Sequence, residues 1–296
     1  MSMKIAGRFK LEAYKLDGSH RVVADWFDNL ILDAGLDRIG AGAPITHCMV
    51  GSGSAAPANG QTALGTQIAS TSTVQSTTTN VELASGYSYL RKTFRFGVGA
   101  AAGNLSEVGT GWSSLLCFSR ALIVDGGGAP TTITILADEI LDVTYELRFY
   151  WPTVDVVDEV VLDGVTYDFT LRASNVGSGY VRLANFDTGG ASIGASSAQG
   201  YHSGSLAALG DLTTIPGGTQ NVQNLGTAVV GAYSNGTFYR DYRISANTSQ
   251  MIVPISALRL NSPFGDFKVG FDPVIPKSNT NTLTFDIRIT WARRVL

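Results

Sequence analysis

The sequence contains two places where a nucleophile could be activated, and neither has the local context that activation needs. Gly190–Gly194 matches the G-x-S-x-G pattern, with Ser192 at its centre and His202 as the nearest histidine. That pattern activates serine only on a strained turn between a strand and a helix, whereas Ser192 lies in a stretch of Gly, Ala and Ser. His47 and Cys48 are adjacent, and on a strand their side chains point to opposite faces, so they cannot form a nucleophile–base pair there.

A glycine-rich stretch, Gly51–Ala56, fits a loose G-x-G-x-x-A pattern after a predicted strand. A dinucleotide site needs a helix N-terminus directly afterwards to hold the pyrophosphate. Pro57 and Gly60 follow instead, so we interpret the stretch as a plain loop.

An acidic stretch could supply oxygen ligands to calcium; its carboxylates are Asp155, Asp158, Glu159 and Asp163. A solvated acidic linker is the simpler interpretation. With three histidines and no cluster of His and Cys, the sequence does not predict a zinc site. We therefore expect no catalytic, cofactor-binding or metal-binding residues and no cofactor.

The remaining charged pairs lie on two similar stretches. Val143–Trp151 alternates apolar and polar residues with period two, which is typical of a half-buried strand. Leu283–Trp291 repeats this pattern almost position by position, with an acid and an Arg two residues apart in each. We expect cross-strand or intersubunit ion pairs from these charges, which are Glu146, Arg148, Asp286 and Arg288. A catalytic acid would need a second carboxylate opposite, and the sequence does not place one.

The composition of the chain favours subunit assembly and argues against some other classes of function. The chain has 296 residues, of which 44% are hydrophobic and only 15% charged, and it contains 34 glycines. Average proteins carry about 25% charged residues, and few charges reduce the cost of burying surface between subunits. The net charge is −3 and Lys and Arg are scattered, so no basic stripe marks a nucleic-acid face and we expect no nucleic-acid partner. We expect no signal peptide and no membrane insertion, because apolar runs of the required length are missing.

Strand-like segments every 8–12 residues, glycine-rich turns and one helix predict a mainly β fold. The helix is predicted over residues 28–39, N-capped by Asp28 and ended by Gly40. Its buried stripe is expected to contain Phe27, Leu30, Ile31 and Ala34. Cys48 and Cys117 could form a disulfide, but nothing in their spacing demands one, and two buried free thiols are the simpler expectation.

The similarity of the two strands predicts two tandem antiparallel β-sandwich units, residues 1–154 with the helix and residues 155–296. Residues 51–80 are predicted to form an exposed, irregular arm, Asn104–Gly111 a polar loop, and residues 188–218 a second long loop. Because the arm and the long loop have little apolar content, we expect both to become ordered only against a partner chain.

An ordered set of short segments runs through roughly residues 25–150. These segments are Asn29–Ile31 with Gly35–Asp37, Val50–Gly53 leading to Ala56–Pro57 and Thr62–Gly65, Leu116–Ile123, Pro130–Thr134 and Asp138–Leu147. Taken as a set and in this order, they resemble tail and tail-tip proteins of tailed bacteriophages. The second half matches only through its closing strand and Pro273–Lys277.

The resemblance implies a non-enzymatic structural component of the virion, made in the bacterial host cytoplasm and present in several copies. We expect partners to be other copies of this chain, with a trimer favoured, and other tail, neck or baseplate proteins. A second hypothesis is a fibre-tip module that binds a host receptor or glycan, with exposed aromatics as its contacts (Tyr180, Tyr201 and Tyr233). The third hypothesis is a β-sandwich hydrolase, but neither a carboxylate pair nor an activated nucleophile emerges from this sequence.

Overall fold

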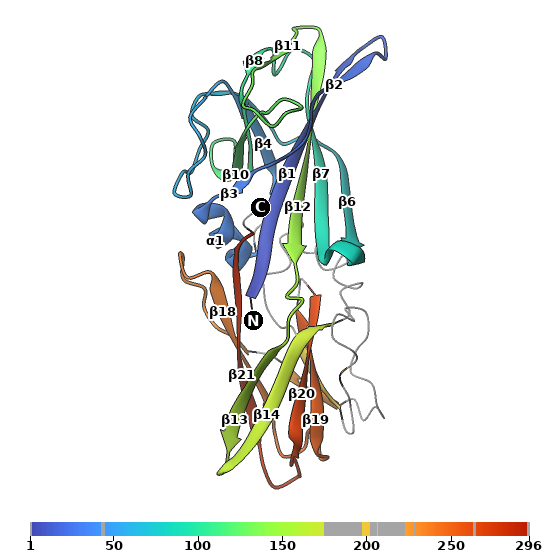
Figure 1. Ribbon diagram of the computed structural model, residues 1–296, viewed down its shortest axis with the longest axis vertical. Coiled ribbons are helices and arrows are strands. Elements are labelled where there is room, and N and C mark those ends of the chain that lie inside the picture. The colour runs from blue at the N-terminus through green and yellow to red at the C-terminus, as the bar shows by residue number, and fades with distance from the viewer. Residues whose placement is uncertain are drawn as a thin grey trace.

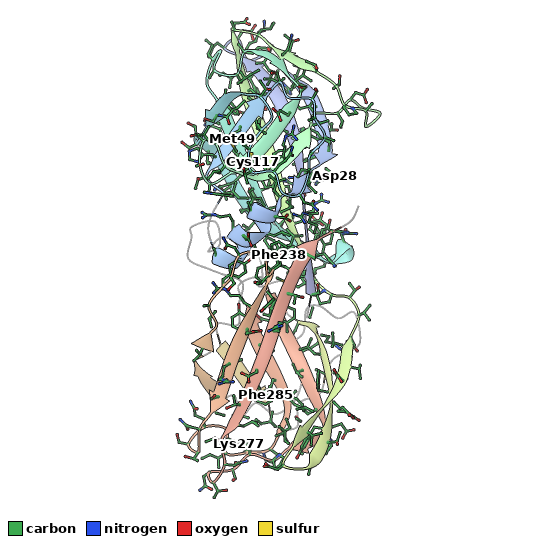
Figure 2. The ribbon with its side chains drawn as sticks, turned by 90° about the vertical axis from the view of Figure 1, so that its left-hand side faces the viewer. Asp28, Met49, Cys117, Phe238, Lys277 and Phe285 are labelled. Atoms are coloured by element: carbon green, nitrogen blue, oxygen red, sulfur yellow. The ribbon has the colours of Figure 1, made fainter. Side chains whose placement is uncertain are left out.

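The computed structural model describes residues 2–42, 45–174, 197–201, 206, 223–227, 229–262 and 265–294. It confirms the mainly β fold with one α-helix in the first half of the chain. The molecule is elongated, with two β bodies along its long axis (Figure 1). In the side view, Met49 and Cys117 lie in one body and Lys277 and Phe285 in the other (Figure 2).

An eight-stranded sheet runs through both bodies. Its spatial order is β17 (Val229–Val230), β18 (Tyr239–Ala246), β21 (Leu283–Arg293), β1 (Ser2–Lys15), β12 (Glu139–Tyr150), β7 (Tyr87–Phe96) and β6 (Val74–Glu82), with β2 (His20–Asp28) paired to β1 off this path. All its pairings are antiparallel except that of β1 with β21. Strands β1 and β2 form an antiparallel hairpin at the start of this sheet.

A second sheet covers the inner face of the first in the N-terminal body. Its order is β3 (Leu30–Ile31), β10 (Cys117–Leu122), β9 (Glu107–Gly111), β4 (His47–Gly51) and β5 (Gln67–Thr71), and a small sheet pairs β11 (Ile133–Ile135) with β8 (Gly103–Leu105). Phe9, Phe94 and Phe149 from the first sheet and Phe118 from the second are fully buried between them. Alternation of apolar residues along each strand produces this core.

The C-terminal body is also built from two layers. Strands β17, β18 and β21 face a six-stranded sheet whose order is β13 (Val156–Leu162), β14 (Val165–Ser174), β20 (Gly265–Ile275), β19 (Ile255–Ser262), β15 (Ser197–Tyr201) and β16 (Gln223–Thr227). A turn at Asp163–Gly164 joins β13 and β14, and both residues have positive φ, 50° and 81°. That geometry suits a two-residue hairpin.

The two similar strands of the sequence, β12 and β21, lie in one sheet with only β1 between them. Their likeness therefore does not mark two separate sheets. One cluster of buried apolar residues also extends through both bodies, from Phe9 to Phe267. The division into residues 1–154 and 155–296 stays a prediction.

The helix begins later than predicted. Helix α1 spans Asp33–Ala41, and Gly42 ends it with φ 71°. Leu30 and Ile31, expected in the helix, instead form β3 and pair with Arg120 and Ser119 of β10. Because Leu30 and Ile31 pair with β10, the helix begins only after them, at Asp33. The buried helical side chains are those of Leu36 and Ile39.

The predicted irregular segments contain strands. Residues 67–71 and 74–82 of the expected arm form β5 and β6, and a short 3₁₀ helix, η1 (Leu83–Ser85), follows. The predicted polar loop Asn104–Gly111 is wrong, because it contains β9, all of whose residues are buried. Within residues 188–218, residues 197–201 form β15, and most of the remainder lies outside the described residues.

Helix α1 also joins the two bodies. The indole Nε1 of Trp291 on β21 donates a buried hydrogen bond of 2.9 Å to the carbonyl oxygen of Leu36. The hydroxyl of Tyr233 donates to Oδ1 of Asp37 at 2.6 Å. A Cβ on Gly40 would lie 2.5 Å from the Tyr233 ring, so glycine allows this close packing.

Gly35 provides a test of the packing between α1 and β10. We expect Gly35→Ala to destabilise the protein by about 1–3 kcal/mol, as overpacking does, because the added Cβ would lie 2.1 Å from the carbonyl oxygen of Phe118. Alanine's higher helix propensity acts in the opposite direction. Gly60→Ala is the matched control, since nothing lies within 4 Å of its Cβ position. Chemical denaturation measures both, and equal stabilities would contradict the close approach.

Candidate functional site

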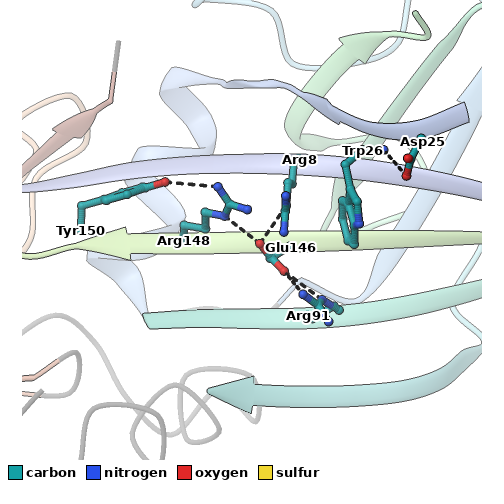
Figure 3. A network of polar contacts seen from close by, with 7 residues as sticks. All are labelled: Arg8, Asp25, Trp26, Arg91, Glu146, Arg148 and Tyr150. Carbon is teal, nitrogen blue, oxygen red and sulfur yellow. Dashed lines mark hydrogen bonds and ion pairs between the residues drawn. The ribbon is translucent and has the colours of Figure 1, made fainter. Parts of the chain in front are cut away.

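The outer face of the central sheet carries arginines grouped around one carboxylate. Strand register places Arg8 on β1 and Arg91 on β7 on either side of Glu146 on β12. Arg148 lies two residues further along β12 and so on the same face. Figure 3 shows the three guanidinium groups converging on Glu146. Strand pairing thus brings together residues that are up to 138 positions apart.

Glu146 is fully buried and accepts hydrogen bonds from all three arginines. Nε of Arg8 lies 2.9 Å and Nε of Arg148 2.7 Å from Oε1, and Nε of Arg91 lies 2.9 Å from Oε2. Burial raises the pKa of Glu146, but the hydrogen bonds from these arginines outweigh burial and hold the pKa below its usual value. The cluster therefore contains three cations and one anion at neutral pH.

Aromatic rings hold the guanidinium planes. Cζ of Arg8 lies 4.2 Å from the centroid of Trp26, and Cζ of Arg148 lies 4.7 Å from that of Tyr87. Tyr87 in turn packs against Tyr150 with centroids 4.9 Å apart. Cation–π contacts of this kind restrict the arginines to few rotamers. We call this set of residues the arginine–aromatic face.

The arginine–aromatic face combines order with access. The side chains of Arg8 and Arg91 are 25% and 36% exposed, although their carboxylate partner is buried. Arg, Tyr and Trp are enriched among the residues that dominate binding energy at protein interfaces. Because Glu146 already fixes the guanidinium groups, a partner that binds them loses less conformational entropy. The face can donate hydrogen bonds to an acidic or planar group.

A second buried carboxylate organises the first half of the predicted arm. Glu107 and Arg120 are both fully buried, and Nε of Arg120 donates to Oε2 of Glu107 at 2.8 Å. The backbone N–H groups of Gly53, Gly65 and Thr66 also donate to Glu107, at 2.9, 2.9 and 2.7 Å. Burial raises the pKa of Glu107, but these donors outweigh it and lower the pKa.

The arm therefore does not need a partner chain for these contacts, contrary to our expectation. Residues 52–66 bind back onto β9 and β10 through a carboxylate, which a count of apolar residues cannot detect. Gly51 and Gly53 are required by the same close approach, since a Cβ on Gly53 would lie 2.4 Å from Oε1 of Glu107. The glycine pattern that resembled a dinucleotide-binding loop thus packs around the carboxylate of Glu107.

The structure describes only some of the nucleophile and base candidates from the sequence. Ser192 and His202 lie outside the described residues. Cys48 is buried and His47 half-buried on β4. Cys48 and Cys117 are free and buried, as predicted, and burial raises the pKa of both thiols, which keeps them protonated.

The predicted ion pairs are confirmed as cross-strand pairs. Besides the Glu146 cluster, Asp286 pairs with Arg243 at 2.8 Å and Arg288 pairs with Asp241 at 2.7 Å, in both cases between β21 and β18. In the acidic stretch, Asp155 pairs with Arg172. No group of three or more potential metal ligands occurs among the described residues.

Tyr233 is not the exposed aromatic that the receptor-binding hypothesis expected. Its ring is half-buried and stacks on Trp291 with centroids 5.6 Å apart. Burial and the hydrogen bond to Asp37 raise its pKa. Tyr180 lies outside the described residues, and the side chain of Tyr201 is likewise not described.

Comparisons with known proteins identify no relative: no family model, no curated protein and no solved structure matches this chain. Within the described part of the chain, no helix has the length and apolar character needed to span a membrane.

Glu107→Gln tests the buried pair. We expect the substitution to lower the free energy of unfolding by about 3–5 kcal/mol, because it leaves the Arg120 charge buried without a counter-ion. Asp286→Asn is the matched control, since it removes one carboxylate of an exposed pair, which contributes little. Urea denaturation of both variants measures the difference, and similar small losses would contradict a buried ion pair.

The lowered pKa of Glu146 predicts that the free energy of unfolding depends on pH. Its pKa is lower in the folded than in the unfolded chain, so its contribution is present above the unfolded value of about 4.3 and is lost as pH falls through the folded value. We expect wild type to exceed Glu146→Gln in stability at pH 7, and the gap to shrink in acid. Denaturation curves across this range measure the gap, and a gap independent of pH would refute the assignment.

Proposed function

We propose that this protein is a non-enzymatic structural component of a phage virion, in the tail, neck or baseplate, where it assembles with other virion subunits. The observation that carries the assembly role is the preorganised arginine–aromatic face. The virion assignment is supported by the resemblance of residues 25–150 to tail proteins. The two supports are independent, because one is a surface and the other a sequence order.

The partner of the arginine–aromatic face is expected to be acidic. The whole chain has a net charge of −3, yet the Glu146 cluster carries an excess of positive charge. The neighbouring carboxylate of Asp142 does not cancel it, because Nε and Nη2 of Arg95 already bind that carboxylate at 2.7 and 2.6 Å. A carboxylate on a partner would bind the fixed guanidinium groups in two-pronged geometry.

The alternative is binding of a host receptor or carbohydrate. It is favoured by a cleft of about 1010 Å³ beside the same face, between β2 and residues 124–131. The cleft is lined by Trp26 together with the carboxylates Asp25, Asp28 and Asp125. An aromatic ring offers a flat apolar surface, and carboxylates accept hydrogen bonds from hydroxyl groups.

Incorporation into particles tests the assembly proposal. We expect the wild-type chain to be present in purified phage particles, and the double variant Arg8→Ala/Arg91→Ala to be incorporated at least about tenfold less, as loss of interface hot spots predicts. Lys15→Ala is the control, because Lys15 forms an exposed pair with Asp138 elsewhere on the sheet. Thermal melting verifies that each variant folds.

Two results would oppose the proposal. Absence of the chain from purified particles would exclude a virion role. Normal incorporation of the double variant, with loss of binding on a glycan array, would favour the alternative.

A further inference from the structure

The outer face of the six-stranded sheet carries a row of three carboxylates. Strand register places Glu159 of β13 directly opposite Asp168 of β14, and Asp168 opposite Asp272 of β20. All three residues are exposed, and neighbouring strands in a sheet are about 4.8 Å apart. Like charges in directly facing positions destabilise a sheet, so this row does not serve the stability of the sheet itself.

The carboxylates of this row are not neutralised by basic residues of the described chain. The ion pairs around the same sheet are formed by other residues, Asp155 with Arg172 and Asp266 with Arg259. Among the described residues, none of the three carboxylates of the row takes part in an ion pair. Their negative charge is therefore available to a partner.

Exposed apolar side chains flank the row. Val157 and Val161 lie two residues before and after Glu159 and therefore on the same face of β13, and they are 70% and 60% exposed. Where one face of an antiparallel sheet meets only water, polar residues are usual at such positions. We call this surface, formed by Val157, Glu159, Val161, Asp168 and Asp272, the acidic β13 face.

The arginine–aromatic face has the complementary composition. Its three arginines surround a single carboxylate. Arg294 adds a fourth cation, since its Cζ lies 3.8 Å from the centroid of Tyr150. Arg294 is exposed and has no carboxylate partner among the described residues. Guanidinium groups of this face can pair with the carboxylates of the acidic β13 face, and its aromatic rings can cover the valines.

The two faces lie on different bodies and on opposite layers. Figure 1 shows β7 and β12 in one body and β13 and β14 in the other. The eight-stranded sheet keeps one inner face through both bodies, because Met3 and its pairing partner Trp291 are both buried, and the arginines stand on its outer face. The acidic β13 face is the outer face of the opposing layer, since the alternate residue Phe169 lines the cleft between the layers. One molecule therefore cannot bring its own two faces together.

We propose that the acidic β13 face of one copy of this chain binds the arginine–aromatic face of a second copy. The inference rests on the assembly role proposed for the arginine–aromatic face, and it names the acidic partner of that face. The contact is heterologous, because the two copies contribute different surfaces and each keeps one surface for a further neighbour. Heterologous contacts close into rings or continue as open chains.

Matched lysine substitutions on β13 test the contact. Asp158 and Glu159 are both exposed and, as neighbours on a strand, point to opposite faces. We expect Glu159→Lys to raise the dissociation constant of self-association at least about tenfold, because the lysine would face the arginines of the second copy. Asp158→Lys is the control, since it changes the net charge equally on the other face and should leave association unchanged. Sedimentation equilibrium measures both, and thermal melting verifies that each variant folds.

Mixing two variants tests whether the two faces are partners of each other. Arg8→Ala/Arg91→Ala keeps an intact acidic β13 face, and Glu159→Lys keeps an intact arginine–aromatic face. Each variant alone is expected to be monomeric at a concentration at which the wild type forms species larger than a dimer. Their equimolar mixture is expected to form a dimer that grows no further, because only one complementary contact can form.

A monomeric wild type would overturn this inference, and so would equal association of the two lysine variants or a mixture that stays monomeric. If Arg8→Ala/Arg91→Ala lost association and Glu159→Lys kept it, the named partner would be refuted, while the assembly role of the arginine–aromatic face would stand. The virion proposal is decided separately, by the presence of the chain in purified particles.

Discussion

Pairing of β1 with its neighbours is the interaction on which the rest of the structure depends. Twelve consecutive residues of β1 pair with β12, and its first residues pair with β21. This single strand therefore belongs to both bodies of the molecule. Its inner side chains, such as Phe9, complete the apolar core, while Arg8 on its outer face binds Glu146. The arginine–aromatic face and the packed core are two sides of one register, so a slip of one residue would destroy both.

Much of the fold could be predicted from periodicity. The boundaries of β7 and β14 agree with the alternation of apolar residues, and β12 and β21 were recognised as strands from the same pattern. The sequence could not show that β12 and β21 share a sheet, because strand order depends on distant pairing rather than on local pattern. The predicted helix boundary was wrong for a related reason. Leu30 and Ile31 fit a helical stripe with Phe27 and Ala34, but they form strand pairs with the distant strand β10 instead.

The polar parts of the structure were the hardest to predict. Glu146 and Arg148 were correctly assigned to ion pairing, since both stand on the polar face of a clear strand. Glu107 was not recognised, because glycine-rich neighbours hide the strand that contains it. Its burial depends on Arg120 and on backbone N–H groups from a loop more than 40 residues earlier. A buried carboxylate with backbone donors leaves no periodic signal, and only the neighbouring glycines indicate how closely the chain approaches it.

The parallel pairing of Ser2–Ile5 with Thr290–Arg293 has a consequence for biosynthesis. Residue 2 leaves the ribosome long before residue 290, so the start of β1 must wait for β21 before its ladder is complete. Contacts between such distant residues slow folding, and exposed strand edges of partly folded chains are prone to wrong pairing. The N-terminal sandwich would then form first, and the pairing of β1 with β21, which joins the two bodies, would form last. Premature termination upstream of β21 would leave β1 with an open edge in every copy.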